Sequence, residues 1–352
     1  MQHIISERLL RWHEGIERKL PWKETKDPYK IWISEIVLQQ TRVQQGMSYY
    51  LKLIERYPRV LDLATSTEDE LMRHWKGLGY YSRARNLHKT AKIIVEKYDE
   101  TFPKSYKEIR SLPGVGPYTA AAISSFAFDL PHAVVDGNVY RVLSRLFSIF
   151  TPINTGAGQK EFQQLAQELL PTAAAAAYNQ AIMDFGALTC TPSKPQCATC
   201  PLDDICKANE QQLQSQLPIK EKKLKRKNRN FISFLLQEKD GFYIRKRTQK
   251  DIWNGLYELP MAETTSIAKE SRLPKPLLTN MVPAGVIEKI DFLCSKKQRL
   301  THQDIKIDFY KVTMSLLKEI AGYKKIKDSS EYAFPRIIDE FLIEYLSKHE
   351  KI

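Results

Sequence analysis

Four of the five cysteines lie within 17 residues, in the segment CTPSKPQCATCPLDDIC, with the spacing C-x6-C-x2-C-x5-C. Thiols this close together, in a chain that does not begin with a secretion signal, favour metal ligation over disulfides. Zinc sites usually show two C-x2–4-C pairs, and here only Cys197 and Cys200 have that spacing. The pattern therefore favours a [4Fe–4S] cluster on Cys190, Cys197, Cys200 and Cys206, with zinc or unligated thiols as alternatives. The isolated Cys294 is interpreted as a small apolar side chain.

The distribution of charge predicts two domains. The chain has 352 residues, more than one compact core usually holds, and a formal net charge of +13. Residues 214–230, QSQLPIKEKKLKRKNRN, contribute +6 of this charge and have no apolar periodicity. We interpret them as a basic linker between domains 1–213 and 231–352. This basic segment is either a solvated tether between the domains or a direct contact with phosphate groups. The excess of Lys and Arg indicates a polyanionic partner, nucleic acid or a membrane surface.

The two predicted domains differ in their secondary-structure signals. Helix signals dominate the first: Asp27-Pro28 opens one helix, Thr67 has capping-box spacing to Glu70, and a basic helix is expected over 82–97. In the second, FISFLLQ and FYIRKR flank an Asp-Gly pair, which predicts a β-hairpin, and the C-terminal PRIIDEFLIEYLSK predicts a helix. The expected fold is a mainly α N-terminal domain followed by an α+β C-terminal domain.

The location of the protein is predicted from what the sequence lacks. No apolar run approaches the roughly 20 residues that span a bilayer. The first residues, MQHIISERLLRWHEG, have neither a basic start with an apolar core nor a cleavage site. We expect a cytoplasmic monomer with no membrane partner, associated with the nucleoid if the source is bacterial.

Residues 112–120, LPGVGPYTA, predict a tight hairpin between two helices. Gly114 and Gly116 bracket Val115, and Pro117 suits the first position of a new helix. We expect both glycines to occupy a turn without room for Cβ atoms, and Val115 to anchor it in the core. Backbone N–H groups of such a hairpin can bind an anion outside the protein. An ordinary helix–turn–helix corner is the alternative.

Together these motifs resemble the helix-hairpin-helix DNA glycosylases that carry an iron–sulfur cluster. LPGVGPYTA, then VVDGNVYRVLSRL, then the cysteine loop occur in the order found in that family. Within it, LPWK, DPYKIWISEIVLQQTRV, WKGLGYYSRARNLH and NQAIMDFGALTCT resemble the adenine-specific branch. The resemblance covers roughly residues 5–210, and the C-terminal half more weakly. It implies hydrolysis of the N-glycosidic bond of adenine mispaired with 8-oxoguanine, or with guanine, in double-stranded DNA.

Breaking that bond calls for a proton donor to the base and a negative charge beside the developing sugar cation. The resemblance assigns the first role to Glu35, an acid in an otherwise apolar helix, where burial would raise its pKa. It assigns the second to Asp136, which precedes a helix and is expected to stay ionised there.

Tyr118 predicts the type of product. Endonuclease III-like relatives have a lysine at this position, and its amine forms a Schiff base that leads to strand cleavage. A phenol cannot form an imine. The resemblance therefore implies a monofunctional glycosylase that leaves an abasic site, with Tyr118 hydrogen-bonded near Asp136 or the sugar.

The remaining site residues follow from the resemblance. DNA contacts are assigned to Gly114, Val115, Gly116, Gln40, Tyr80 and Lys194. Recognition of the flipped base is assigned to Lys23 and Gln180. Lys23 departs from the usual LPWR motif and lacks the planar guanidinium of arginine. The basic residues of 82–92 are expected to face DNA.

Residues 231–352 resemble the Nudix-like lesion-recognition domain of the same family. Leu300, Thr301 and His302 stand where the family has Phe-Ser-His, the loop that contacts 8-oxoguanine. The metal-binding R-E-x-x-E-E helix of Nudix hydrolases does not follow DIWNGLYELP, which argues against a nucleotide hydrolase. An endonuclease III-like bifunctional glycosylase is the competing enzyme, and a catalytically silent, cluster-bearing DNA-binding protein is the competing non-enzyme.

Overall fold

The computed structural model describes residues 2–221, 226–238, 241–264, 278, 281–282, 286–315 and 320–349. The chain divides into two compact units, which we describe separately. The first comprises residues 1–66 and 85–222, and the second comprises 67–84 and 223–352. Within the described residues, no helix combines the length and apolar character needed to cross a bilayer.

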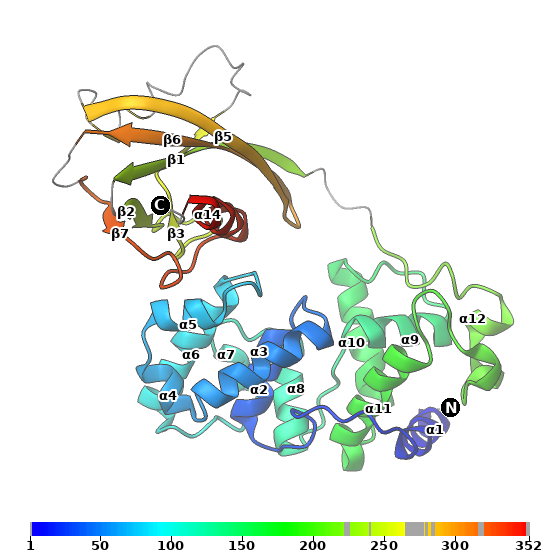
Figure 1. Ribbon diagram of the computed structural model, residues 1–352. Coiled ribbons are helices and arrows are strands. Elements are labelled where there is room, and N and C mark those ends of the chain that lie inside the picture. Colours follow the sequence, from blue (N-terminus) through cyan, green and yellow to red (C-terminus); the bar gives the residue numbers. More distant parts are fainter. Residues whose placement is uncertain are drawn as a thin grey trace. The chain divides into compact units, whose positions relative to one another are not determined.

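The first unit is helical (Figure 1). Its helices are α1 (Gln2–Glu14), α2 (Pro28–Leu38), α3 (Val43–Arg56), α4 (Val60–Thr65), α7 (Tyr106–Ser111), α8 (Pro117–Phe128), α9 (Gly137–Phe147), α10 (Gly156–Leu169), α11 (Ala175–Leu188) and α12 (Lys207–Glu210), together with α6 (Ser82–Tyr98) from residue 85 onward. Short 3-10 turns, η1 (Thr172–Ala174), η2 (Cys197–Thr199) and η3 (Asp203–Ile205), lie between them. The predicted helical domain and its basic helix are confirmed.

Local sequence signals set several helix starts. Asp27 caps α2 by accepting a hydrogen bond from Tyr29 N, and Pro28 occupies the first turn. Apolar faces of α1, α9, α10 and α11 then meet in one core that contains Leu9, Phe162 and Phe185. Each of these three side chains is almost completely buried. Burial of that size stabilises the helices more than their intrinsic propensity does.

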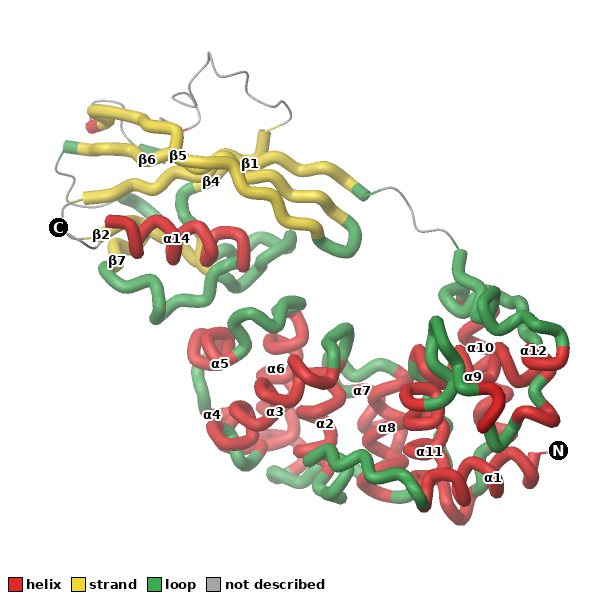
Figure 2. The backbone as a smooth tube through the Cα atoms, turned by 45° about the vertical axis from the view of Figure 1, so that its right-hand side comes forward, coloured by secondary structure: helices red, strands yellow, loops and turns green. Residues whose placement is uncertain are grey.

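The second unit is built on a mixed sheet (Figure 2). Its strands are β1 (Lys227–Glu238), β2 (Gly241–Lys246), β3 (Tyr257–Glu258), β4 (Met261–Thr264), β5 (Ile287–Arg299), β6 (Gln303–Met314) and β7 (Lys324–Ile326). The strand order is β3-β2-β1-β6-β5, with β4 pairing β1 and β7 pairing β2. β1 and β6 run parallel, and the other pairs are antiparallel. The predicted β1–β2 hairpin is present, although Lys239 and Asp240 of its turn lie outside the described residues.

The alternation of apolar residues along β1 places a core on each face of this sheet. Phe231 and Leu235 pack on the side of α14 (Arg336–His349), where Phe309 stacks on Phe341 with ring centroids 3.9 Å apart. Phe234 and Leu236 belong to the core on the opposite face. An α+β C-terminal domain is thus confirmed, and α14 is the helix predicted at its C-terminal end (Figure 2).

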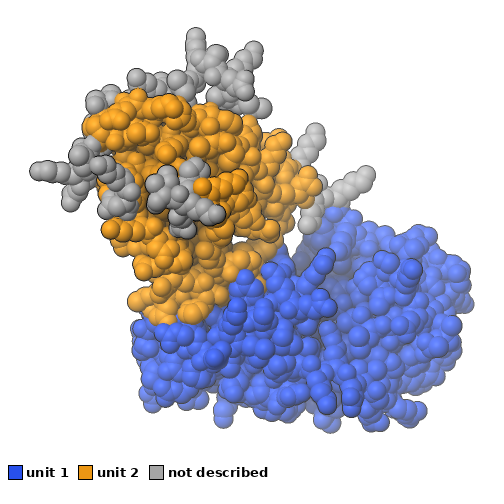
Figure 3. Space-filling view, viewed as in Figure 1, with its two compact units in different colours: residues 1–66, 85–222 blue, residues 67–84, 223–352 orange. Residues whose placement is uncertain are grey.

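Residues 67–84 group with the sheet rather than with the helices that flank them in sequence (Figure 3). They include α5 (Glu68–His74), which Thr67 caps by accepting from Glu70 N. Asp69 accepts from Lys246 Nζ at 2.6 Å and from the Tyr257 hydroxyl at 2.9 Å. Lys76 pairs with Asp339 of α14 at 2.7 Å. These polar contacts explain why residues 67–84 group with the sheet, which the sequence did not suggest.

Both ends of the segment interpreted as a linker, 214–230, take part in the folded units. Leu217 is buried, its carbonyl accepts from Arg145, and the Ile219 carbonyl accepts from Ile153 N. At the other end, β1 begins at Lys227 and pairs with β6. Residues 222–225 lie outside the described residues. The polar composition of 214–230 did not indicate that its two ends are folded. A short apolar run such as Leu-Pro-Ile can pack within a polar segment, and lysine and arginine are tolerated at the end of a strand.

Candidate functional site

A cavity of about 560 Å³ opens in the first unit. It is bordered by the segment before α2, by α2 itself, by the start of α8 and by one side of α9 and α11. Six residues predicted from the sequence line it: Lys23, Glu35, Gln40, Tyr118, Asp136 and Gln180. Arg18, Asn138 and Asp184 also line it and were not predicted. The structure therefore brings together side chains as distant in sequence as Lys23 and Asp184, which are 161 positions apart.

Glu35 lies on α2 and is 6% exposed. Burial raises the pKa of its carboxyl to about 7, opposed by a hydrogen bond from Tyr118 and supported by the charge of Asp136. Tyr118, at the start of α8, thus contacts Glu35, and the charge of Asp136 acts on it as well. Burial and the two carboxylates raise the pKa of Tyr118 well above its usual value, so this phenol stays protonated. A carboxyl poised near neutral pH suits proton transfer.

Asp136 is the N-cap of α9, as predicted. Its carboxylate accepts from Asn138 N and Val139 N, each at 2.8 Å, and from Asn138 Nδ2 at 2.8 Å. Burial nevertheless raises the pKa of Asp136, while the hydrogen bonds from Val139 and Asn138 act in the opposite direction. The expectation that the helix end alone keeps this carboxylate ionised was therefore incomplete, because desolvation opposes it. Three hydrogen-bond donors stabilise the negative charge in this site.

A chain of hydrogen bonds connects Asp136 to the first cysteine. Asn138 accepts through Oδ1 from Arg141 Nη2 at 2.9 Å, and Arg141 Nε donates to the Cys190 carbonyl at 2.8 Å. Arg141 also donates to the Gly186 carbonyl at 2.6 Å. The backbone of the cysteine loop therefore fixes Arg141, and Arg141 fixes the amide that contacts Asp136.

The α11 side of the cavity carries a cluster of charges centred on Asp184. This aspartate is fully buried and accepts from His13 Nε2 at 3.0 Å and from Arg18 Nη1 at 2.6 Å. It also pairs with Lys23 Nζ at 2.5 Å. Lys23 is therefore fixed at the cavity by an acid that the sequence did not single out. Gln180 lies one helical turn before Asp184 and borders the same cavity.

The hairpin over 112–120 forms as predicted, with one correction. Gly114 has φ +76°, and a Cβ there would lie 2.7 Å from Asn86 Cβ. Val115 is buried, and Pro117 starts α8. Gly116, in contrast, has φ −80°, and a Cβ there would meet nothing within 4 Å. Only Gly114 is thus required by the fold, and the open space at Gly116 leaves its backbone accessible to an external group.

All four clustered cysteines line one small pocket between α9, α11 and α12. Hydrogen-bond donors approach three of the sulfurs: Arg145 Nη1 to Cys190 at 3.4 Å, Leu202 N to Cys200 at 3.4 Å, and Gln214 Nε2 to Cys197 at 3.9 Å. Within the described residues, no three His, Cys, Asp or Glu side chains are close enough to hold a single metal ion. The structure thus places the four thiols of the predicted ligand set around one shared space.

Two of the predicted residues, Gln40 and Tyr80, lie at backbone positions that are unusual for them. Gln40 has φ +57° and Tyr80 has φ +48°, in the left-handed region that non-glycine residues rarely adopt. Both side chains are exposed, Tyr80 at 47%. Strained residues of this kind concentrate at functional sites. Nearby Arg83 differs from its prediction, because it is buried against Trp75 and Tyr80 instead of facing solvent.

The predicted lesion loop is the turn of the β5–β6 hairpin. Thr301 and His302 are exposed, and Thr301 Oγ1 hydrogen-bonds with the Tyr80 hydroxyl at 2.5 Å. Leu300, in contrast, is partly buried and packs against the core of the second unit, so it is not a free apolar wedge. Lys194 is exposed in the cysteine loop, and its carbonyl accepts from Thr191 Oγ1 at 2.7 Å.

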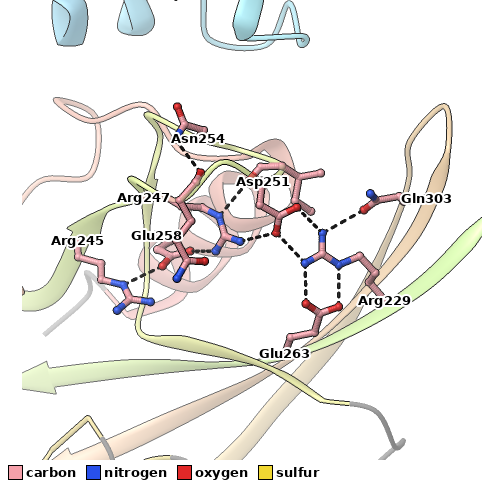
Figure 4. Close-up of polar contacts among 10 residues, drawn as sticks. Arg229, Arg245, Arg247, Asp251, Asn254, Glu258, Glu263 and Gln303 are labelled. Carbon is pink, nitrogen blue, oxygen red and sulfur yellow. Dashed lines mark hydrogen bonds and ion pairs between the residues drawn. The ribbon is translucent and has the colours of Figure 1, made fainter.

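Three acidic residues of the second unit, Asp251, Glu258 and Glu263, are paired with arginines (Figure 4). Arg229 contacts Asp251 at 2.7 Å and Glu263 at 2.6 Å, and Arg247 joins Asp251 to the buried Glu258. Carboxylates engaged in this way do not form a metal site. Most of the segment where the Nudix helix was sought, residues 265–277, lies outside the described residues.

Comparison with known proteins places this architecture in a family. Residues 33–172 match the model of the HhH-GPD superfamily of base excision DNA repair proteins. An adenine DNA glycosylase of Buchnera aphidicola subsp. Baizongia pistaciae is 37% identical over 308 residues, which are 87% of this chain and 85% of that protein. That of Buchnera aphidicola subsp. Schizaphis graminum is 32% identical over 97% of this chain and 98% of its own.

The chain belongs to the adenine DNA glycosylase family. A solved thermostable thymine-DNA glycosylase is also similar, with 32% identity and a TM-score of 0.56 over 60% of this chain and 97% of that one. The family resemblance inferred from the sequence motifs is thereby confirmed, as is the helical fold of the N-terminal part.

In this adenine DNA glycosylase family member, sequence reasoning missed four residues of the site: Arg18, Asn138, Arg141 and Asp184. Asp184 had a visible signal, since it is a lone acid in the apolar stretch NQAIMDFGAL, just as Glu35 is in IWISEIVL. Arg141 had none, because a basic residue on an amphipathic helix usually faces solvent.

Replacing Cys200 with serine tests the cysteine assignment. We expect the purified variant to lose most of its bound iron and its visible absorbance. Its melting temperature should fall by at least about 5 °C, because a structural metal centre contributes directly to folding. Cys294→Ser is the matched control, since Cys294 lies in the sheet unit and packs against its core. Unchanged iron content in the Cys200 variant would exclude the proposed ligand set.

Proposed function

We propose that this protein removes adenine mispaired with 8-oxoguanine, or with guanine, from double-stranded DNA and leaves an abasic site. One observation carries the proposal: Glu35, with a pKa of about 7, and the hydrogen-bonded Asp136 border the same cavity. The adenine DNA glycosylases to which the chain is 32–37% identical support adenine as the substrate.

The target base has to leave the duplex to reach the cavity. At about 560 Å³ the cavity has room for a purine together with ordered water. Lys23 and Gln180 would contact the edge of the base, since both line the cavity. The exposed Gln40 and Tyr80 are suited to fill the space that the base leaves in the stack. Residues Gly114 to Gly116 and Lys194 are suited to contact phosphate.

Glu35 would donate its proton to N7 of adenine as the bond between N9 and C1′ breaks. Adenine then leaves as a neutral base, with the electron pair of the broken bond on the ring. The sugar becomes cationic, and the Asp136 carboxylate stabilises it across the cavity. Water then adds to C1′, and its proton returns to the Glu35 carboxylate. One carboxyl protonated near neutral pH and one hydrogen-bonded carboxylate provide the two functions.

Tyr118 supports a monofunctional reaction. Its hydroxyl hydrogen-bonds to Glu35, and its raised pKa keeps it protonated. A phenol cannot form a Schiff base with C1′, and no amine occupies this position. The abasic strand should therefore stay intact until it is treated with alkali.

Cys190, Cys197, Cys200 and Cys206 would hold a [4Fe–4S] cluster. When bound, the cluster would supply structural cross-linking of the loop over 190–206. Because Arg141 and Arg145 donate to backbone carbonyls of this loop, its shape bears on the position of Asn138 and Asp136. Exposed Thr301 and His302 would contact 8-oxoguanine on the opposite strand, and Tyr80 is hydrogen-bonded to Thr301.

The product of one reaction tests the monofunctional assignment. A duplex with a single adenine opposite 8-oxoguanine is incubated with the protein, and half of the sample is then treated with alkali. We expect full-length strand without alkali and a break at the adenine position after it. Efficient breakage without alkali would favour an endonuclease III-like bifunctional enzyme. A Tyr118→Lys variant is the informative comparison, since it supplies the amine that the wild type lacks.

A further inference from the structure

We propose that Asp184 is a positioning residue of the base pocket, which fixes the N-terminal wall of the cavity and the side chain of Lys23. The inference rests on the proposed function, because it concerns the pocket that would hold the flipped base.

The contacts of Asp184 converge from one stretch of the chain. His13 is at the end of α1, and Arg18 and Lys23 lie in the segment between α1 and α2, where the structure has no long helix or strand. All three contact one carboxylate on α11. A wall with little backbone hydrogen bonding of its own is thus held to a rigid helix by side chains, as an accurate binding site requires.

Because these groups are buried, the loss of one of their contacts is expected to have a large effect. The Asp184 side chain is 1% exposed, and that of Lys23 is 13% exposed. Ion pairs away from solvent are weakly screened, and removing one partner leaves an uncompensated charge. Burial alone would raise the pKa of Asp184, but the hydrogen bonds from His13, Lys23 and Arg18 lower it to about 2. The carboxylate is therefore ionised throughout the working range of pH.

Lys23 depends on this charge. Burial lowers the pKa of its ammonium, the hydrogen bond and charge of Asp184 oppose that shift, and the charge of Arg18 adds to it. Among the described residues, these are the charged groups that act on Lys23. An ammonium has three N–H donors, and Asp184 accepts one. The others remain for acceptor atoms of a base in the cavity that Lys23 lines.

Asp184→Asn tests the proposal in single-turnover adenine release from an adenine:8-oxoguanine duplex, measured from pH 6 to 9.5. We expect a rate about 10- to 100-fold below wild type at neutral pH, since small displacements in a site have effects of that size. Both proteins should lose activity near pH 7 through Glu35. The variant should show a second decline at a lower pH than wild type does, because Lys23 gives up its proton more easily without Asp184. A purely structural role would not move this part of the pH profile.

A double-variant comparison separates the two residues. Lys23→Met should reduce the rate and keep only the fall near pH 7 that Glu35 causes, without the further decline caused by Lys23. Adding Asp184→Asn to it should cost less than about threefold more. Multiplicative losses, or a folded Asp184→Asn protein with the wild-type rate and profile, would overturn the proposal. If Asp184→Asn does not fold, Lys23→Met still tests the proposal, because Asp184 keeps its contacts with Arg18 and His13 in that variant. A wild-type rate of adenine release by Lys23→Met would equally refute the inference.

The matched control is Asp129→Asn. Asp129 also pairs with a lysine of the N-terminal segment, Lys26 at 2.8 Å, but both side chains are more than 60% exposed. We expect its rate and pH profile to match wild type. The proposed function is tested independently of this inference. If the wild-type protein releases no adenine, the proposed function is refuted, whatever the result for the Asp184 variant.

Discussion

Replacing Asp136 with asparagine should abolish adenine release while DNA binding persists. We expect a single-turnover rate at least about 10³-fold below wild type, because the variant lacks the negative charge that faces the developing sugar cation. The fold should survive, since asparagine caps helices about as well as aspartate and can still accept from Asn138 N and Val139 N. Rates are measured with adenine opposite 8-oxoguanine, and binding by fluorescence anisotropy on the same duplex.

The control for Asp136→Asn is Asp62→Asn. Asp62 is likewise an acid that accepts from the backbone at the start of a helix, α4, where it also pairs with Arg59 at 3.0 Å. It does not border the cavity. Near-normal turnover by the Asp136 variant would contradict the mechanism, and a shared loss in both variants would indicate a folding defect instead.

Replacing Glu35 with glutamine should reduce adenine release about 10²- to 10⁴-fold, the range associated with general acid–base catalysis. The amide keeps the size of the side chain and can accept a hydrogen bond from Tyr118, but it has no proton to give. In the wild type the protonated form predominates below pH 7, so the rate of base release should fall as pH rises through about 7. The variant should lack this fall, which a pH series of single-turnover rates would show.

The same substitution should stabilise the protein at alkaline pH. The folded-state pKa of Glu35 is raised, from 4.5 to about 7, so its ionisation costs folding free energy as pH rises through that interval. Above pH 7 the cost reaches about 3 kcal/mol, which the neutral amide does not incur. We expect a higher melting temperature for Glu35→Gln than for wild type at pH 8, and little difference at pH 5. Equal melting temperatures at both values would contradict the assigned burial.

The fold was predictable where local signals and packing agree. Asp27-Pro28 and Pro117 mark helix starts that the structure has, and FISFLLQ and FYIRKR around an Asp-Gly pair mark the β1–β2 hairpin. Glu35 stands out as a lone acid in an apolar helix, and the family resemblance assigned it the role of proton donor. The cysteine spacing specified four side chains that line one pocket. In each case the chemistry of a short segment was sufficient.

The parts that were not predictable depend on long-range contacts. Nothing near Tyr118 in sequence indicates that Glu35, 83 positions earlier, accepts its hydrogen bond. The role of Asp184 arises only when α11 packs beside the segment before α2. The grouping of residues 67–84 with the sheet depends on the hydrogen bond between Asp69 and Lys246, and the composition does not indicate that pairing. The raised pKa of Asp136 reflects burial, which its position before a helix does not reveal.

The identity of the released base tests the central proposal most directly. Duplexes with adenine opposite 8-oxoguanine, guanine or thymine are incubated with the protein, and free bases are identified by mass spectrometry. The proposal predicts free adenine from the first two duplexes, fastest from the 8-oxoguanine one, and little from the adenine:thymine pair. Release of no adenine from any duplex, or of an oxidised pyrimidine from a duplex that contains one, would contradict it.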